Sequence, residues 1–184
     1  MQAQELIPEI FKSEYSKLVA VLCKQFGLEQ LEMAEDLVND TFLLATVNWE
    51  KNGLPEKPVP WLYAVAKNKT RDLLKRKILF EQKIAPQIAV HQYEAQEPDF
   101  SESHIEDSQL QMIFAVCHAS IPIEAQIGLA LRILCGFSID EIAEAFLSSK
   151  ETINKRLYRA KETLRKEKVK LEMPPENQLY ARMG

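Results

Sequence analysis

Glycine is scarce in this chain, with five residues among 184. A sheet-rich fold needs many tight turns, and glycine is a residue on which such turns depend. Apolar residues make up 46% of the chain, which is enough to fill real cores. The composition therefore predicts an all-α fold, built as one ordinary domain or as two small ones.

Cysteine is also rare, and long apolar runs are missing. The three cysteines are widely spaced and form neither a disulfide framework nor a zinc-binding pattern, which favours a reducing compartment. The most apolar stretch, residues 113–137, is interrupted by charged residues and a proline, and the N-terminus lacks a signal peptide. We therefore expect a cytoplasmic protein that does not enter a membrane.

Motifs of catalysis are absent as well. None of the three histidines follows a glutamate by three residues, so a helical Glu-x-x-His metal site is missing. The chain has no glycine-rich phosphate loop and no recognisable nucleophile motif. We expect no metal, no cofactor and no enzymatic activity.

The net charge of −4 hides a strong segregation of charge along the chain. Six basic residues and one acid lie between Lys67 and Lys77, and nine basic residues and three acids lie between Lys150 and Lys170. The stretch from Glu94 to Asp107 holds six acids and no lysine or arginine. Local charge thus permits a nucleic-acid partner that the total charge would argue against.

Apolar residues recur at helical spacing in five stretches, which are followed by two shorter helical units after Gly136. The five stretches are residues 6–26, 34–45, 61–79, 105–119 and 123–135. Between the third and the fourth, the periodicity is lost and the chain becomes acidic and contains two prolines, as in a solvated linker. We therefore expect two small helical domains, residues 1–80 and 105–170, with a linker at 81–104 and a tail at 171–184.

A helix-turn-helix motif is predicted in the second domain. Ser138 and Glu141 form a capping box that starts one helix, and Ser148 and Glu151 repeat the spacing and are expected to start another. The tight turn between them contains Leu147, where many such motifs have glycine. Two short helices joined in this way can place the second helix in a major groove of DNA.

The second helix of this motif carries polar and basic residues suited to DNA. Lysine and arginine neutralise phosphates or read guanine, and asparagine can pair with adenine. The alternative without a DNA-binding role is an amphipathic helix pair whose basic face is merely solvated. The polar and basic residues that this helix carries are Lys150, Thr152, Asn154, Lys155, Arg156, Arg159 and Lys161.

Phe137-Ser-Ile-Asp-Glu-Ile-Ala-Glu-Ala-Phe146 with Thr152-Ile-Asn-Lys-Arg-Leu-Tyr-Arg-Ala-Lys161 resembles region 4 of the sigma-70 family. Ala34-Glu-Asp-Leu-Val-Asn-Asp-Thr-Phe42 resembles the polymerase-binding helix of region 2, and the segment from Pro60 to Arg76 resembles the part that engages the −10 element. The small size is similar to the extracytoplasmic-function (ECF) group. Residues 113–137 further resemble a subgroup that carries a C-terminal extension.

This resemblance implies a protein that binds bacterial core RNA polymerase and promoter DNA and helps to open the duplex. Asp36, Asn39, Asp40 and Phe42 would contact the clamp helices of the largest polymerase subunit, although Phe42 also suits the core. The family further suggests an anti-sigma factor or a C-terminal regulatory extension as a partner.

The resemblance also assigns the promoter elements. The residues implied for the −35 element are Lys150, Thr152, Asn154, Lys155, Arg156 and Arg159. Arg156 and Arg159 can share one helix face, and at least one of them is expected to contact phosphate. Trp61 could stack on a base, or it could belong to the core. The residues implied for the −10 element are Asn68, Lys69, Arg71, Asp72, Lys75 and Arg76.

Two alternatives stay open. A helix-turn-helix repressor that acts without polymerase would explain residues 137–165 but not residues 34–76, and such repressors usually dimerise. The acidic linker could thread toward the polymerase channels or could simply be solvated. In a third possibility, the linker or the tail folds over a basic face of the free protein and inhibits it.

Overall fold

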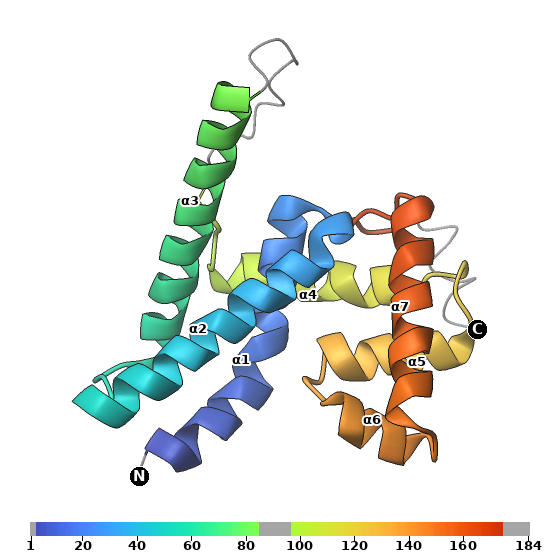
Figure 1. Cartoon of the computed structure of the whole chain (residues 1–184), viewed down its shortest axis with the longest axis horizontal. Coiled ribbons are helices and arrows are strands. Elements are labelled where there is room, and N and C mark those ends of the chain that lie inside the picture. Colours follow the sequence, from blue (N-terminus) through green and yellow to red (C-terminus); the bar gives the residue numbers. More distant parts are fainter. Residues whose placement is uncertain (1–2, 85–96, 175–184) are drawn as a thin grey trace.

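The computed structural model describes residues 3–84 and 97–174. The described residues form α-helices and one short 3-10 helix, with no strand, so the all-α prediction is confirmed. No helix among them is long and apolar enough to cross a membrane. The elements are α1 (Ala3–Phe26), η1 (Leu28–Gln30), α2 (Leu31–Asn52), α3 (Pro58–Ile84), α4 (Glu102–Val116), α5 (Ile123–Ile133), α6 (Ile139–Ala145) and α7 (Lys150–Lys166) (Figure 1).

The two helices that flank the predicted linker both extend further into it than expected. Helix α3 starts at Pro58, a residue suited to the first turn because it needs no backbone donor, and it continues to Ile84. Helix α4 starts at Glu102, three residues before the predicted start at Ile105. The two ends of the predicted linker, residues 81–104, are therefore helical, and residues 85–96 lie outside the described part of the chain.

Helices α1, α2 and α3 pack together around large apolar side chains. Helix α1 turns into η1 at Gly27, whose φ of 92° favours glycine over any residue with a Cβ atom. Trp49 of α2 is 2% exposed, and its ring meets that of Trp61 of α3 edge to face, with centroids 5.4 Å apart. This contact favours the core alternative for Trp61.

Helices α4 to α7 form the second part of the fold, and they share one core with the first part. Helix α4 packs mainly against α1. Met112 of α4, Leu129 of α5 and Ile142 of α6 belong to the same buried cluster as Leu18 and Leu22 of α1. The two parts, although far apart in sequence, are thus joined by apolar burial.

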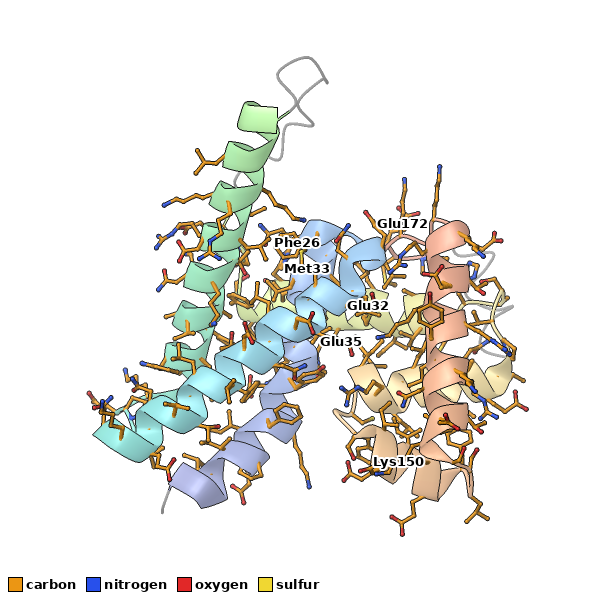
Figure 2. All side chains as sticks on the ribbon, viewed as in Figure 1. Phe26, Glu32, Met33, Glu35, Lys150 and Glu172 are labelled. Atoms are coloured by element: carbon orange, nitrogen blue, oxygen red, sulfur yellow. The ribbon has the colours of Figure 1, made fainter. Side chains whose placement is uncertain are left out.

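A buried carboxylate adds a polar link between the two parts. Glu35 of α2 has a side chain 8% exposed, and it lies 2.6 Å from the Nζ atom of Lys161 on α7 and 3.7 Å from the Nε atom of Arg132 on α5. Figure 2 shows Glu32 and Glu35 on the side of α2 that faces α7. Glu32 pairs with Arg165 at 3.5 Å, but both of these side chains are far more exposed, at 54% and 40%.

The predicted helix-turn-helix motif is present, with one correction. Ser138 caps α6 in a full capping box, in which the backbone N–H of Glu141 donates to the Ser138 hydroxyl at 3.2 Å. The second box is wrong, because Ser149 rather than Ser148 caps α7 and accepts from the backbone of Thr152. Ser148 instead donates its backbone N–H to Ala143 at 2.9 Å and so completes the end of α6.

Leu147 adopts a left-handed conformation at the end of α6. Its φ is 47°, its backbone N–H donates to Glu144 at 3.0 Å, and its side chain is 94% exposed. Together with the Ser148 hydrogen bond, this is a Schellman motif with leucine at the position that glycine usually takes. The turn therefore carries backbone strain that no packing of the leucine side chain offsets.

Replacing Leu147 by glycine should stabilise the protein by about 0.5–1 kcal/mol, because relief of the left-handed strain exceeds the entropy gained by the unfolded chain. Urea denaturation followed by circular dichroism measures the change. Leu147→Ala is the matched control, since alanine removes the same exposed side chain and keeps the strain. Equal stabilities of the two variants would contradict the assignment of strain to this turn.

Removing the charge of Glu35 should destabilise the protein by about 2–4 kcal/mol, because Glu35→Gln leaves Lys161 and Arg132 without their carboxylate in a mostly buried place. Glu32→Gln makes the same chemical change at an exposed pair and should cost at most about 0.5 kcal/mol. Urea unfolding of both variants tests the difference. Similar small losses would mean that the buried cluster does not hold the two parts together.

Candidate polymerase and promoter surfaces

One face of α2 combines acidic and apolar side chains that are open to solvent. Asp36, Asp40, Leu43 and Val47 follow each other at spacings of four, three and four residues, so they share one helix face. Leu43 is 63% exposed and Val47 is 57% exposed. Exposed apolar side chains beside charged ones are typical of a protein-binding surface.

The predicted members of the α2 surface divide into two groups. Asp36, Asn39 and Asp40 are exposed, whereas Phe42 is 5% exposed and packs edge to face on Phe11, with centroids 4.9 Å apart. The ring of Phe42 thus belongs to the core beneath the surface. Sequence reasoning missed Leu43 and Val47, although apolar residues on both faces of one helix were a signal for them.

The six residues predicted for the −10 element lie on the solvent side of α3. Its opposite side is held in the core by Leu62, Ala66, Thr70 and Leu74, each at most 4% exposed. Five of the six side chains are exposed and Lys69 is half-buried. The predicted set, all on this one helix, is Asn68, Lys69, Arg71, Asp72, Lys75 and Arg76.

Carboxylates already contact part of this basic surface. The Nζ atom of Lys69 lies 3.8 Å from Asp40 on α2, and Arg71 lies 3.7 Å from Glu97. Glu97 also pairs with Lys67 at 2.6 Å, and this hydrogen bond holds the pKa of Glu97 below its usual range. Sequence reasoning placed Lys67 in the basic stretch but did not bring Glu97 to it, because the contact is tertiary.

The helix-turn-helix presents its second helix, α7, with one face buried. Ile153, Leu157, Ala160 and Leu164 are each at most 4% exposed and fix α7 on α5 and α6. Its N-terminal turn lies next to α6, where the label of Lys150 marks it in Figure 2. The C-terminal half of α7 also pairs with α2, and the exposed side of its N-terminal half is open to another molecule.

Five of the six residues predicted for the −35 element are exposed on α7, and two of the six contact side chains of α6 or of its C-cap. Arg156 is half-buried, and its guanidinium lies over the ring of Phe146, 5.3 Å from the centroid. Lys150 pairs with Asp140 of α6 at 2.6 Å. Arg159 is exposed, and within the described part of the chain its guanidinium contacts no residue of α6, so it is the better placed arginine for a phosphate.

Tyr158 was missed by the sequence reasoning. Its side chain is 61% exposed and lies one helical turn after Asn154, so the two residues share a face. A tyrosine there offers an aromatic face and a hydroxyl group to a DNA edge. Counting four residues on from Asn154 would have found it.

The described residues hold no group of three or more histidine, cysteine or acidic side chains that could bind a metal ion. The surfaces of α2, α3 and α7 are instead suited to binding. Their chemistry is that of charge pairing, hydrogen bonding and apolar contact.

Two family models match this chain, one in each part of the fold. The family model of sigma-70 region 2 matches residues 11–78, and that of sigma-70 region 4 matches residues 111–164. An uncharacterised protein of Rhizobium meliloti (strain 1021) is 31% identical over 135 residues, which cover 71% of this chain and 32% of that protein. The chain thus spans about a third of the length of this relative. No solved structure matches the chain.

The two matched regions together cover most of both parts of the fold, α1 to α3 and α4 to α7. Their order, region 2 before region 4, is typical of ECF sigma factors. A region 2 and a region 4 belong to a transcription regulator that recognises promoters. The chain is therefore a member of the sigma-70 family of DNA-binding transcription initiation factors.

Proposed function

We propose that this protein binds bacterial core RNA polymerase through α2, reads the −35 element with α7 and the −10 element with α3, and helps to melt the promoter. The observation that carries the proposal is the separation of the three surfaces on one helical body. Helices α3 and α7 lie on opposite sides of α1 and α2 in Figure 1, so two DNA-binding helices can act at two places.

The contact with polymerase rests on the mixed character of the α2 surface. Asp36 and Asp40 give electrostatic complementarity to a basic partner and set the orientation. Leu43 and Val47 supply apolar area that is buried on docking. Phe42 acts from beneath, because its packing on Phe11 fixes the position of the helix.

The contact with the −35 element rests on α7. Lys155 and Arg159 are exposed and one turn apart, so they suit the phosphates along a groove. Asn154 and Tyr158 lie beside them and can meet base edges. The buried face of α7 keeps these side chains on a rigid support.

Promoter melting rests on α3. Unstacking a base costs a few kcal/mol per step, and contacts to the freed strand must offset this cost. A cationic helix with polar side chains can hold the phosphates of that strand. Lys75 and Arg76 are exposed on the outer part of α3 and have the charge for this task.

Reversing one charge on α2 should abolish the complex with core polymerase. Asp36→Arg places a cation where the proposal needs an anion, and we expect the dissociation constant to rise by at least about a hundredfold. Size-exclusion chromatography and fluorescence anisotropy with core polymerase measure the loss. The matched control is Asp107→Arg, which makes the same charge change at an exposed position of α4.

Unchanged polymerase binding by Asp36→Arg, or an equal loss with Asp107→Arg, would contradict the role of the α2 surface. Duplex DNA binding by the same two variants, measured without polymerase, distinguishes the repressor alternative from the proposal. A repressor binds duplex DNA strongly without polymerase, and its affinity is indifferent to residue 36.

Two substitutions on α7 should weaken promoter binding of the polymerase complex in different ways. Arg159→Ala removes a phosphate contact, so we expect affinity to fall for all sequences and the slope of log K against log salt to drop by about one. Asn154→Ala removes a base contact, so we expect discrimination at one −35 position to fall by about 1–3 kcal/mol. Lys166→Ala, at the far end of α7, is the charge control.

Binding to a −35 sequence series at several salt concentrations measures both effects. If Arg159→Ala lowered sequence specificity and left the salt dependence unchanged, Arg159 would contact a base and not a phosphate. No effect of either substitution would remove α7 from the promoter interface.

A further inference from the structure

The segment before α4 lies on the basic face of α3. Glu97 pairs with Lys67 at 2.6 Å and approaches Arg71 to 3.7 Å. Lys67 and Arg71 are four residues apart, so they share one helix face, and one carboxylate meets both cations. An anion is thus held where a phosphate of a bound DNA strand would be held.

An aromatic contact accompanies this anion. The ring of Phe100 stacks on that of Tyr63, with centroids 5.0 Å apart and the planes only 7° from parallel. Tyr63 lies one turn before Lys67 on the same face, and its hydroxyl group donates a hydrogen bond to Glu14 of α1. The orientation of the Tyr63 ring is therefore fixed, and its face is a platform for a flat partner.

The segment is held against α3 by the packing of α4. The Asp99 carboxylate accepts the backbone N–H of Ser101 at 2.9 Å, directly at the start of α4, and α4 packs on α1. Between the segment and α3 remains a hollow of about 410 Å³, lined by Tyr63, Ala64 and Lys67 and by residues 97–100. The contact thus has the two elements that proteins use for single strands, a cationic track and a stacking platform.

We propose that residues 97–100 occupy, in the free protein, the part of α3 that takes one base and the adjacent phosphate of single-stranded promoter DNA. The carboxylate of Glu97 stands in for the phosphate on Lys67 and Arg71, and the ring of Phe100 stands in for the base on Tyr63. This inference rests on the proposed function, and it adds that the chain itself regulates access of DNA to the −10 surface on α3. Single-stranded DNA and the segment compete for α3.

The competition is weak enough to be reversed by DNA. The Glu97 and Lys67 side chains are 46% and 43% exposed, and such ion pairs contribute little. A stacked aromatic pair adds a moderate attraction. Because the segment is part of the chain, its effective concentration is nevertheless high. We expect its removal to raise the affinity for single-stranded DNA between about threefold and thirtyfold.

The experiment measures binding of a fluorescein-labelled, mixed-sequence single-stranded oligodeoxynucleotide by fluorescence anisotropy at low salt. The full chain is compared with Glu97→Gln, with Phe100→Ala and with the double variant. The single Glu97→Gln variant keeps Phe100, so it still tests the proposal if loss of the ring disturbs the fold. Glu106→Gln is the matched control, because it removes the same charge from an exposed position of α4.

The proposal expects tighter binding by Glu97→Gln and most of all by the double variant, with Glu106→Gln like the original chain. Adding Lys67→Ala to the double variant should cancel the gain, since DNA then loses a contact on the exposed face. If Glu106→Gln raised the affinity for the strand by the same factor, the effect would come from net charge alone, and the proposal would be overturned.

Failure of this inference can be told from failure of the proposed function. If the double variant binds no tighter, but Lys67→Ala weakens binding, α3 binds the strand and the segment does not compete. If no variant of the free protein binds the strand at all, the competition is overturned, whereas the proposed role of α3 in the polymerase complex is judged by promoter opening and not by this assay.

Discussion

The structure depends on the complete burial of the middle of α1. Six consecutive residues, 18–23, are each at most 1% exposed, so this part of the helix is covered on every side. A helix that is apolar all round lies in the centre of a fold. Helices α2, α3, α4 and α5 all contact α1. Burial of α1 therefore decides where the other helices stand.

The position of each binding surface follows from this arrangement. Helices α2 and α3 each bury one face in the core around α1. The other face is exposed to solvent, and it carries the acids of α2 and the cations of α3. Helix α4 packs on α1 and so carries residues 97–100 to α3. The burial of Glu35 between α2, α5 and α7 then fixes the helix-turn-helix relative to region 2.

Features that depend on local sequence were predictable. Helical periodicity indicated the helices, and the spacing of Ser138 and Glu141 identified the start of α6 because a capping box involves only neighbouring residues. The second start was placed one residue early, at Ser148. The spacing alone could not show that the backbone of Ser148 is used by the Schellman motif of α6.

Features that depend on packing between distant segments were not predictable. Helical spacing predicted α1 as a helix, but the burial of residues 18–23 on every side depends on the neighbours that surround them in space. Leucine and valine are usually core residues, so the sequence did not indicate that Leu43 and Val47 are exposed. They are exposed because the face of α2 that carries Phe42 is the one packed on Phe11. Glu97 meets Lys67 only because α4 folds back across α1.

The same tertiary contacts reconcile an acidic chain with a DNA partner. Three cations of the predicted promoter surfaces have carboxylate neighbours: Lys69 is near Asp40, Arg71 is near Glu97, and Lys150 is paired with Asp140. Phosphates must displace these carboxylates, so part of the electrostatic gain of DNA binding is already present within the folded chain. The net charge of −4 further opposes non-specific binding. In the proposed complex, polymerase would position the promoter beside the protein and so supply the local concentration at which phosphates replace the carboxylates.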